Sequence, residues 1–257
     1  MSSIVTDRGV IHYETYGRGQ PVILLHCWLG SWNYWLSTME VLADGYKTYA
    51  LDFWGFGESG KKGLQFRVKD YVEMVAQFMD QLGIYRARVM GHSMGGTVSL
   101  SLALSHPERV QRVAIVGSPI TGDGLALMLK LAAKKPLAAL AYSIPGALPI
   151  GVRLASPFLT RDWRRWSEMF EQDTLESFHY SIASLRRTDL RPRLREIRIP
   201  VLGIYGRNDR IVNPNQGEIL ANGVPLAQVV YFDHSGHFPM LDEPERFHQI
   251  LREFLDR

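Results

Sequence analysis

The sequence predicts an α/β protein: a mostly parallel central β-sheet with helices on both faces and a helical cap inserted into it. Three observations lead to this prediction. Short apolar segments with the length of strands alternate with helical segments, which is the order of right-handed βαβ units. The alternation stops between residues 119 and 195, where β-branched runs are lacking and the composition is helical. It then resumes and continues to the last helix.

The individual elements follow from local patterns. Residues 4–16 are typical of a β-hairpin around the turn Asp7-Arg8-Gly9. Residues 21–26 form a continuous apolar run, as expected for a central strand buried on both faces. Apolar side chains at three-to-four spacing predict a helix over 68–82. The other expected strands are 46–51, 87–90, 112–116, 200–205 and 227–232, and the other expected helices begin near 32, 97, 213 and 244.

This order of elements gives a single domain with one insertion. Residues 1–118 and 196–257 are assigned to the α/β core, and residues 119–195 to the helical cap. The chain of 257 residues is near the upper length for one domain, and 46% of its residues are hydrophobic, enough for a large core.

Charge and cysteine content restrict the partners and the compartment. The net charge of +3 is not clustered on one face, which argues against nucleic acid as a partner. Cys27 is the single cysteine, so no disulfide can form within the chain, and a cytoplasmic location is expected. No signal peptide is visible, and prolines interrupt the charge-free stretch before Arg153, so no transmembrane segment is expected. The composition does not indicate the oligomeric state.

The strongest chemical signal is Gly91-His92-Ser93-Met94-Gly95-Gly96. An apolar strand precedes this segment and a helix follows it, which is the context of a nucleophile elbow. The turn forces Ser93 into a strained conformation, and a Cβ at Gly91 or Gly95 would collide with the neighbouring strand or helix. Ser93 also lies at a helix N-terminus, where free N–H groups favour developing negative charge.

A nucleophilic serine needs a base, and the base needs a group that orients it. Parallel strands deliver such side chains at their carboxyl ends. Asp209 follows the strand that ends at Tyr205, and His237 follows the strand that ends at Phe232. The chain order Ser93, Asp209, His237 is the order expected for this type of elbow.

With these segments the sequence resembles the α/β-hydrolase fold superfamily, in its capped form with a serine nucleophile. The resemblance covers nearly the whole chain and is weakest in the cap. Four landmarks carry it: His26-Cys27-Trp28-Leu29-Gly30, the elbow, Gly206-Arg207-Asn208-Asp209, and Gly236-His237-Phe238-Pro239 followed by Glu243-Pro244.

The resemblance implies a role for each of these residues. Ser93 is the expected nucleophile, His237 the general base, and Asp209 the group that orients the imidazole. The backbone N–H groups of Trp28 and Met94 are the expected oxyanion donors. Family members usually have glycine where this chain has Cys27, and this difference puts the oxyanion geometry in question.

Other polar residues near these landmarks receive structural interpretations. Asp52 follows a strand and is interpreted as a carboxylate that orders its loop, and His234 as a structural or exposed residue. Asp233 and Asp242 flank His237 and are interpreted as turn residues. No cluster with metal-ligand spacing and no dinucleotide motif is present in the sequence, so neither a metal nor a cofactor is expected.

The expected substrate is a small, uncharged and largely hydrophobic acyl compound, because apolar residues gather near the strand ends and in the cap. The predicted pocket residues are Trp54, Leu125, Met128, Leu129, Tyr142, Phe158 and Phe238.

An ester hydrolase that works through an acyl-enzyme is the leading functional hypothesis. Relatives with the same motifs leave two enzymatic alternatives: a carbon–carbon bond hydrolase of ring-cleavage diketones, and a cofactor-free perhydrolase or haloperoxidase. A cationic group in the cap, for which Arg153, Arg161 and Arg165 are candidates, would favour the carbon–carbon hydrolase. A small-molecule binding protein that retains the triad is the non-catalytic alternative.

Overall fold

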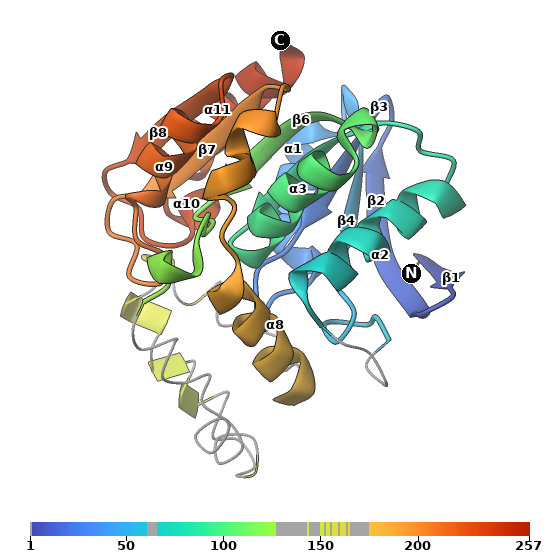
Figure 1. The fold of residues 1–257 in the computed structure, drawn as a ribbon, viewed down its shortest axis with the longest axis horizontal. Helices are drawn as coiled ribbons and strands as arrows, with labels where there is room; N and C mark the ends of the chain where they lie inside the picture. Colours follow the sequence, from blue (N-terminus) through green and yellow to red (C-terminus); the bar gives the residue numbers. More distant parts are fainter. Residues whose placement is uncertain are drawn as a thin grey trace.

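Eight strands form one sheet in the order β1-β2-β4-β3-β5-β6-β7-β8 (Figure 1). The computed structural model describes residues 2–60, 66–126 and 175–257, together with residues 143, 150, 151, 153, 154, 156–158, 160–162 and 164. The strands are β1 Ser2–Thr6, β2 Gly9–Gly17, β3 Gln20–Leu25, β4 Tyr46–Leu51, β5 Ala87–His92, β6 Val110–Val116, β7 Val201–Gly206 and β8 Ala227–Phe232. β2 is antiparallel to β1 and to β4, and all other neighbouring strands are parallel. The predicted fold class is therefore confirmed.

Helices follow the strands in the order that the sequence predicts. In the described residues the α-helices are α1 Leu36–Leu42, α2 Val68–Gln81, α3 Met94–Ser105, α8 Leu175–Arg187, α9 Gln216–Gly223, α10 Pro239–Asp242 and α11 Pro244–Asp256. Short 3-10 helices are η1 Trp32–Trp35, η2 Pro107–Arg109, η3 Gly122–Gly124, η4 Ser156–Phe158 and η5 Arg191–Glu196. The helix expected from 213 begins only at 216, because the Asn213 side chain accepts a hydrogen bond from the Asn215 N–H and forms a turn there.

Alternating side chains of each strand divide the core between the two faces of the sheet. Leu25, Val89 and Ile115 belong to a cluster that also includes residues of α2 and α3. Leu24 and Met90 belong to a second cluster with residues of α1 and α11. Figure 1 shows α2 and α3 in front of the sheet. This two-sided burial explains why the central strands read as continuous apolar runs.

The described part of the expected cap includes helix α8 and a few residues before it. The N–H of Val68, the first residue of α2, donates to the Ser184 hydroxyl at 3.0 Å, so α8 contacts the start of α2. An isolated antiparallel bridge joins Thr121 to Asp189 and brings the two ends of the expected insertion together. The boundaries of the cap at 119 and 195 stay a prediction. None of the helices in the described residues is long and apolar enough to cross a membrane.

Candidate active site

Ser93 forms the sharp turn between β5 and α3. Its φ of 53° and ψ of −114° lie outside the regions that non-glycine residues ordinarily occupy. A Cβ at Gly91 would lie 2.1 Å from the carbonyl carbon of Gly95, and a Cβ at Gly95 would lie 2.3 Å from the carbonyl oxygen of Leu25. The Ser93 N–H donates to the Val116 carbonyl at 2.8 Å, which fixes the strained residue to the neighbouring strand. The glycines thus provide the space that the turn requires.

His237 and Asp209 are hydrogen-bonded. The His237 Nδ1–H donates to Asp209 Oδ2 at 2.7 Å, and both side chains are buried. The other oxygen of Asp209 accepts from the N–H groups of Ile211 at 2.7 Å and Val212 at 2.9 Å. The carboxylate is therefore fixed by its own loop, and the bond to it leaves Nε2 of His237 as the acceptor nitrogen of the neutral ring.

His92 links this pair to the serine turn. It precedes Ser93, and its Nε2–H donates to the His237 carbonyl at 2.8 Å. The two imidazole rings are 4.7 Å apart between centroids. Since residues 92 and 93 are consecutive, this bond places the backbone of His237 beside the elbow at the carboxyl ends of the parallel strands.

Trp28 and Met94 lie at the ends of β3 and β5, where the sequence places the oxyanion donors. Met94 is the first residue of α3, and Trp28 lies in the turn closed by the bond from the Gly30 N–H to the Cys27 carbonyl at 3.3 Å. Neither the N–H of Trp28 nor that of Met94 is a donor in the turn, loop and cap hydrogen bonds between backbone groups of the described residues.

His26 holds the Trp28 loop against the loop after β4. Its Nδ1–H donates to the Cys27 carbonyl at 2.6 Å, and its Nε2 accepts from the Phe53 N–H at 2.9 Å. Burial lowers the pKa of His26, which keeps the ring neutral and able to accept. Burial also lowers the pKa of His92 far below its ordinary value, and the nearby His237 adds to this effect.

Cys27 belongs to the same loop, and its side chain is buried. Its burial raises the pKa of the thiol to about 12, so the sulfur is protonated and unreactive at neutral pH. The thiol therefore packs as a small apolar group.

The predicted pocket residues fall into two groups in the described residues. Trp54 and Leu125 are buried in the α2–α3 cluster, which also includes Met94. Phe238 is buried in the other cluster, where its ring lies 4.8 Å from that of His92 and 5.7 Å from that of Tyr34. Phe238 therefore packs against His92 and Tyr34, in a different cluster from Trp54 and Leu125.

Four predicted pocket residues cannot be placed. Met128, Leu129 and Tyr142 lie outside the described residues, as does the side chain of Phe158. The sequence interpretation did not include Phe178, whose ring lies 4.6 Å from that of Trp28. The buried positions Phe178, Ile182 and Leu185 follow helical spacing, which was the available signal for this helix face.

The structural interpretations of the neighbouring polar residues are largely confirmed. Asp52 is buried and accepts from the N–H groups of Trp32 at 2.7 Å and Glu58 at 3.0 Å, so it orders its loop. His234 is exposed. Asp233 is exposed and pairs with Arg207. Asp242 accepts hydrogen bonds from three donors and thus has more contacts than a simple turn residue.

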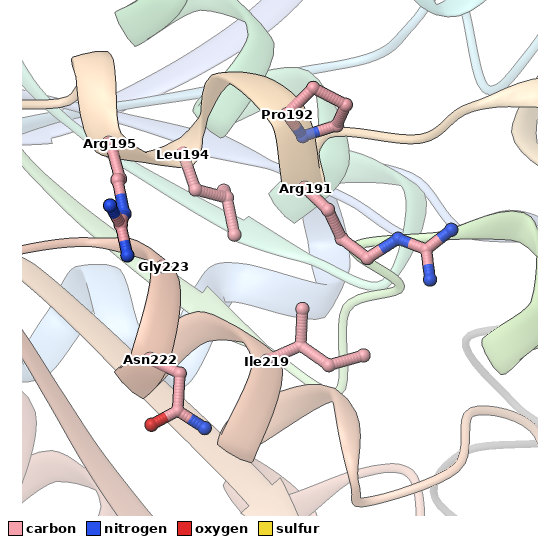
Figure 2. A pocket seen from close by; sticks show the side chains of 7 residues that line it. All are labelled: Arg191, Pro192, Leu194, Arg195, Ile219, Asn222 and Gly223. Atoms are coloured by element: carbon pink, nitrogen blue, oxygen red, sulfur yellow. The ribbon is translucent and has the colours of Figure 1, made fainter.

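Described residues line at least three pockets. One of about 420 Å³ lies between η5 and α9, and Leu194 and Ile219 are among the residues that line it (Figure 2). Another, of about 300 Å³, is lined by Pro157, Thr160, Arg161, Asn208, Arg210, His234 and Gly236. No group of three or more His, Cys, Asp or Glu side chains that could hold a metal occurs in the described part of the chain.

Comparison with known proteins identifies the family. The sequence profile of the alpha/beta hydrolase fold matches residues 20–244, and the chain belongs to this family. A 2-hydroxy-6-oxo-6-phenylhexa-2,4-dienoate hydrolase from Comamonas testosteroni is 30% identical over 96% of this chain and 91% of its own length. A pimeloyl-[acyl-carrier protein] methyl ester esterase from Nitrosomonas europaea is 29% identical over 92% of this chain and 96% of its own length.

Solved structures agree on the fold. An enol-lactonase from Burkholderia xenovorans LB400 superposes with a TM-score of 0.85 at 21% identity, and the match covers 100% of both chains. The names of these relatives describe hydrolases with different substrates, so the comparisons support a hydrolase and leave the substrate open.

Proposed function

We propose that the protein is a serine hydrolase that cleaves a largely hydrophobic carboxylic ester through an acyl-enzyme. The observation that carries this proposal is the bond from His237 to Asp209 beside the strained turn of Ser93. In this proposal the Ser93 Oγ attacks the ester carbonyl carbon while His237 Nε2 takes the hydroxyl proton. The same nitrogen returns the proton to the departing alkoxide, and water then cleaves the acyl-enzyme by the reverse sequence.

Asp209 holds His237 in the tautomer that can accept this proton and stabilises the charged imidazolium. The N–H groups of Trp28 and Met94 donate to the oxyanion that forms on the carbonyl oxygen. Their positions, after the end of β3 and at the start of α3 next to Ser93, support this assignment. Trp28, Trp54, Leu125 and Phe178 supply apolar surface on the side of the sheet that faces α8. The insertion at 119–195 acts as the cap over this surface, and the single cysteine supports a cytoplasmic location.

A fluorophosphonate probe and a panel of p-nitrophenyl esters test the proposal. Wild-type protein should take up one probe molecule and hydrolyse esters, with the preferred chain length reporting the size of the pocket. Ser93→Ala should show neither reaction, at a loss of roughly 10⁶-fold in kcat. Intact, folded protein that takes up no probe while a control esterase is labelled contradicts the proposal.

A carbon–carbon bond hydrolase is the second candidate, and two observations favour it. The Comamonas relative acts on a dienoate, which carries a carboxylate. Arg161, one of the three candidate cap arginines, lines a pocket together with Asn208 and Gly236. These two residues directly precede Asp209 and His237 in the sequence. Turnover of a coloured dienoate with poor turnover of nitrophenyl esters, and loss of that preference in Arg161→Gln, would assign this chemistry.

A further inference from the structure

Asp242 joins the loop that carries His237 to a segment of the expected cap. We call residues 233–238 the histidine loop and residues 160–162 the cap segment. Asp242 Oδ2 accepts from the Gly236 N–H at 2.8 Å, directly before His237. Asp242 Oδ1 accepts from the Thr160 hydroxyl at 2.6 Å and from the Arg161 N–H at 2.7 Å. One carboxylate therefore bridges two segments that are more than 70 residues apart in the sequence.

The cap side of this bridge is well ordered by its own bonds. Thr160 is buried, with 4% of its surface exposed. Its hydroxyl oxygen accepts from the Asp162 N–H at 3.2 Å, and its N–H donates to the Ser156 carbonyl at 3.3 Å. The Thr160 hydroxyl thus uses a lone pair for the Asp162 N–H and donates its single proton to Asp242.

The loop side of the bridge fixes the backbone on both sides of His237. The Asp242 N–H donates to the Phe238 carbonyl at 3.0 Å, so residues 236–242 form a closed loop. Across this loop the His237 carbonyl accepts from His92 at 2.8 Å. The backbone of this loop is thus held by Asp242 at the Gly236 N–H and by the serine turn at the His237 carbonyl.

We propose that Asp242 is a positioning residue for His237 and that it transmits the placement of the cap segment to the imidazole. The inference rests on the proposed function, in which His237 is the base. Three donors converge on the two carboxylate oxygens, an arrangement that an amide with one acceptor oxygen cannot satisfy. Positioning of this kind matters because a displacement of about 1 Å can cost on the order of 10²-fold in rate.

Asp242→Asn is the first test, with Asp233→Asn as the matched control. Asp233 lies on the same histidine loop, but its side chain is exposed and pairs with Arg207 at the surface. We expect Asp242→Asn to lower kcat by about 10- to 100-fold with little change in KM, since the residue acts on the base and not on substrate binding. We expect Asp233→Asn to retain the wild-type kcat.

Two measurements follow the bridge without relying on turnover. Amide hydrogen exchange of Gly236 reports its bond to Asp242, and the low-field proton resonance of the His237 Nδ1–H reports its bond to Asp209. Asp242→Asn should speed the exchange and shift or broaden the resonance. Thr160→Val removes the hydroxyl donor but keeps the carboxylate, and it should change both signals in the same direction by less.

These measurements separate the possible outcomes. Folded Asp242→Asn with wild-type kcat and wild-type exchange at Gly236 overturns the proposal, and so does Thr160→Val with unchanged exchange at Gly236. Where Asp242→Asn does not fold, Thr160→Val decides. Wild-type protein without any turnover removes the proposed function, and the exchange and resonance data then still test the bridge.

Discussion

His92 donates a hydrogen bond from a fully buried imidazole to the carbonyl oxygen of His237 at 2.8 Å. The bond needs a proton on Nε2, and burial lowers the pKa of His92 so that the second nitrogen carries none at neutral pH. The residue before the candidate nucleophile thus holds the residue that we propose as its base. Two segments 145 positions apart are joined without a charged group at the contact.

The buried state of His92 predicts how stability depends on pH. Its pKa in the folded chain is lowered, so below about pH 6.5 the unfolded chain binds a proton that the folded chain does not. As the pH decreases below 6.5, the free energy of unfolding should therefore fall by up to about 1.4 kcal/mol per pH unit through this residue. Above pH 6.5 the contribution of this residue should be constant. Denaturant titrations between pH 5 and 8 measure this dependence. His92→Asn should show a shallower decline, and an equal slope in both proteins contradicts the prediction.

Asp209→Asn tests the orientation of His237. Asp209 Oδ1 accepts from two backbone N–H groups, so the amide oxygen of the variant should take that place and turn its NH₂ towards His237. His237 Nδ1 must then accept, and the ring proton moves to Nε2, which can no longer take a proton from Ser93. We expect kcat to fall by roughly 10⁴-fold with the fold retained. Ester kinetics and circular dichroism check this, and a loss below tenfold would contradict the proposed role of Asp209.

The fold and the position of the serine turn could be predicted because local patterns determine them. Apolar runs gave the central strands, three-to-four spacing gave α2, and the glycines around Ser93 indicated a crowded turn. Asp209 and His237 could be selected because parallel strands end at one edge of the sheet. Their hydrogen bond agrees with that selection, and their catalytic roles stay predictions.

Contacts between distant segments could not be predicted from these patterns. Asp242 was interpreted as a turn residue, yet it also accepts from Thr160 and Arg161, which are about 80 residues away. Phe238 is a predicted pocket residue because it lies near a strand end, and the sequence does not indicate that its ring packs against Tyr34 and His92. Local spacing fixes which element a residue belongs to, whereas the partner of a side chain depends on tertiary packing.

Cys27 should react slowly with alkylating agents in the folded protein. Burial raises the pKa of its thiol to about 12, so at pH 8 only about 10⁻⁴ of it is thiolate. Mass spectrometry after treatment with iodoacetamide at pH 8 should find folded protein largely unmodified. The same protein in guanidinium chloride should be modified at one site, which serves as the control. Fast modification of the folded protein would show that Cys27 is accessible and reactive.

Gly117→Ala should reduce activity by crowding the pair of His237 and Asp209. An added Cβ would lie 3.1 Å from His237 Nδ1 and 3.3 Å from Asp209 Oδ2, and the backbone φ of +50° is unfavourable for alanine. We expect a loss of at least about tenfold in kcat from displacement of the imidazole. We also expect a cost of about 1–2 kcal/mol in the free energy of unfolding from the left-handed backbone.

Gly83→Ala is the matched control for this substitution. Gly83 has a similar φ of +65°, but an added Cβ there meets nothing within 4 Å. The control should therefore lose a similar amount of stability and keep the wild-type kcat, because only the backbone strain is shared. Ester kinetics and denaturant titration of both variants separate the two effects. Wild-type kcat in Gly117→Ala would mean that the imidazole can move aside without cost, and that its present position is not the one used in catalysis.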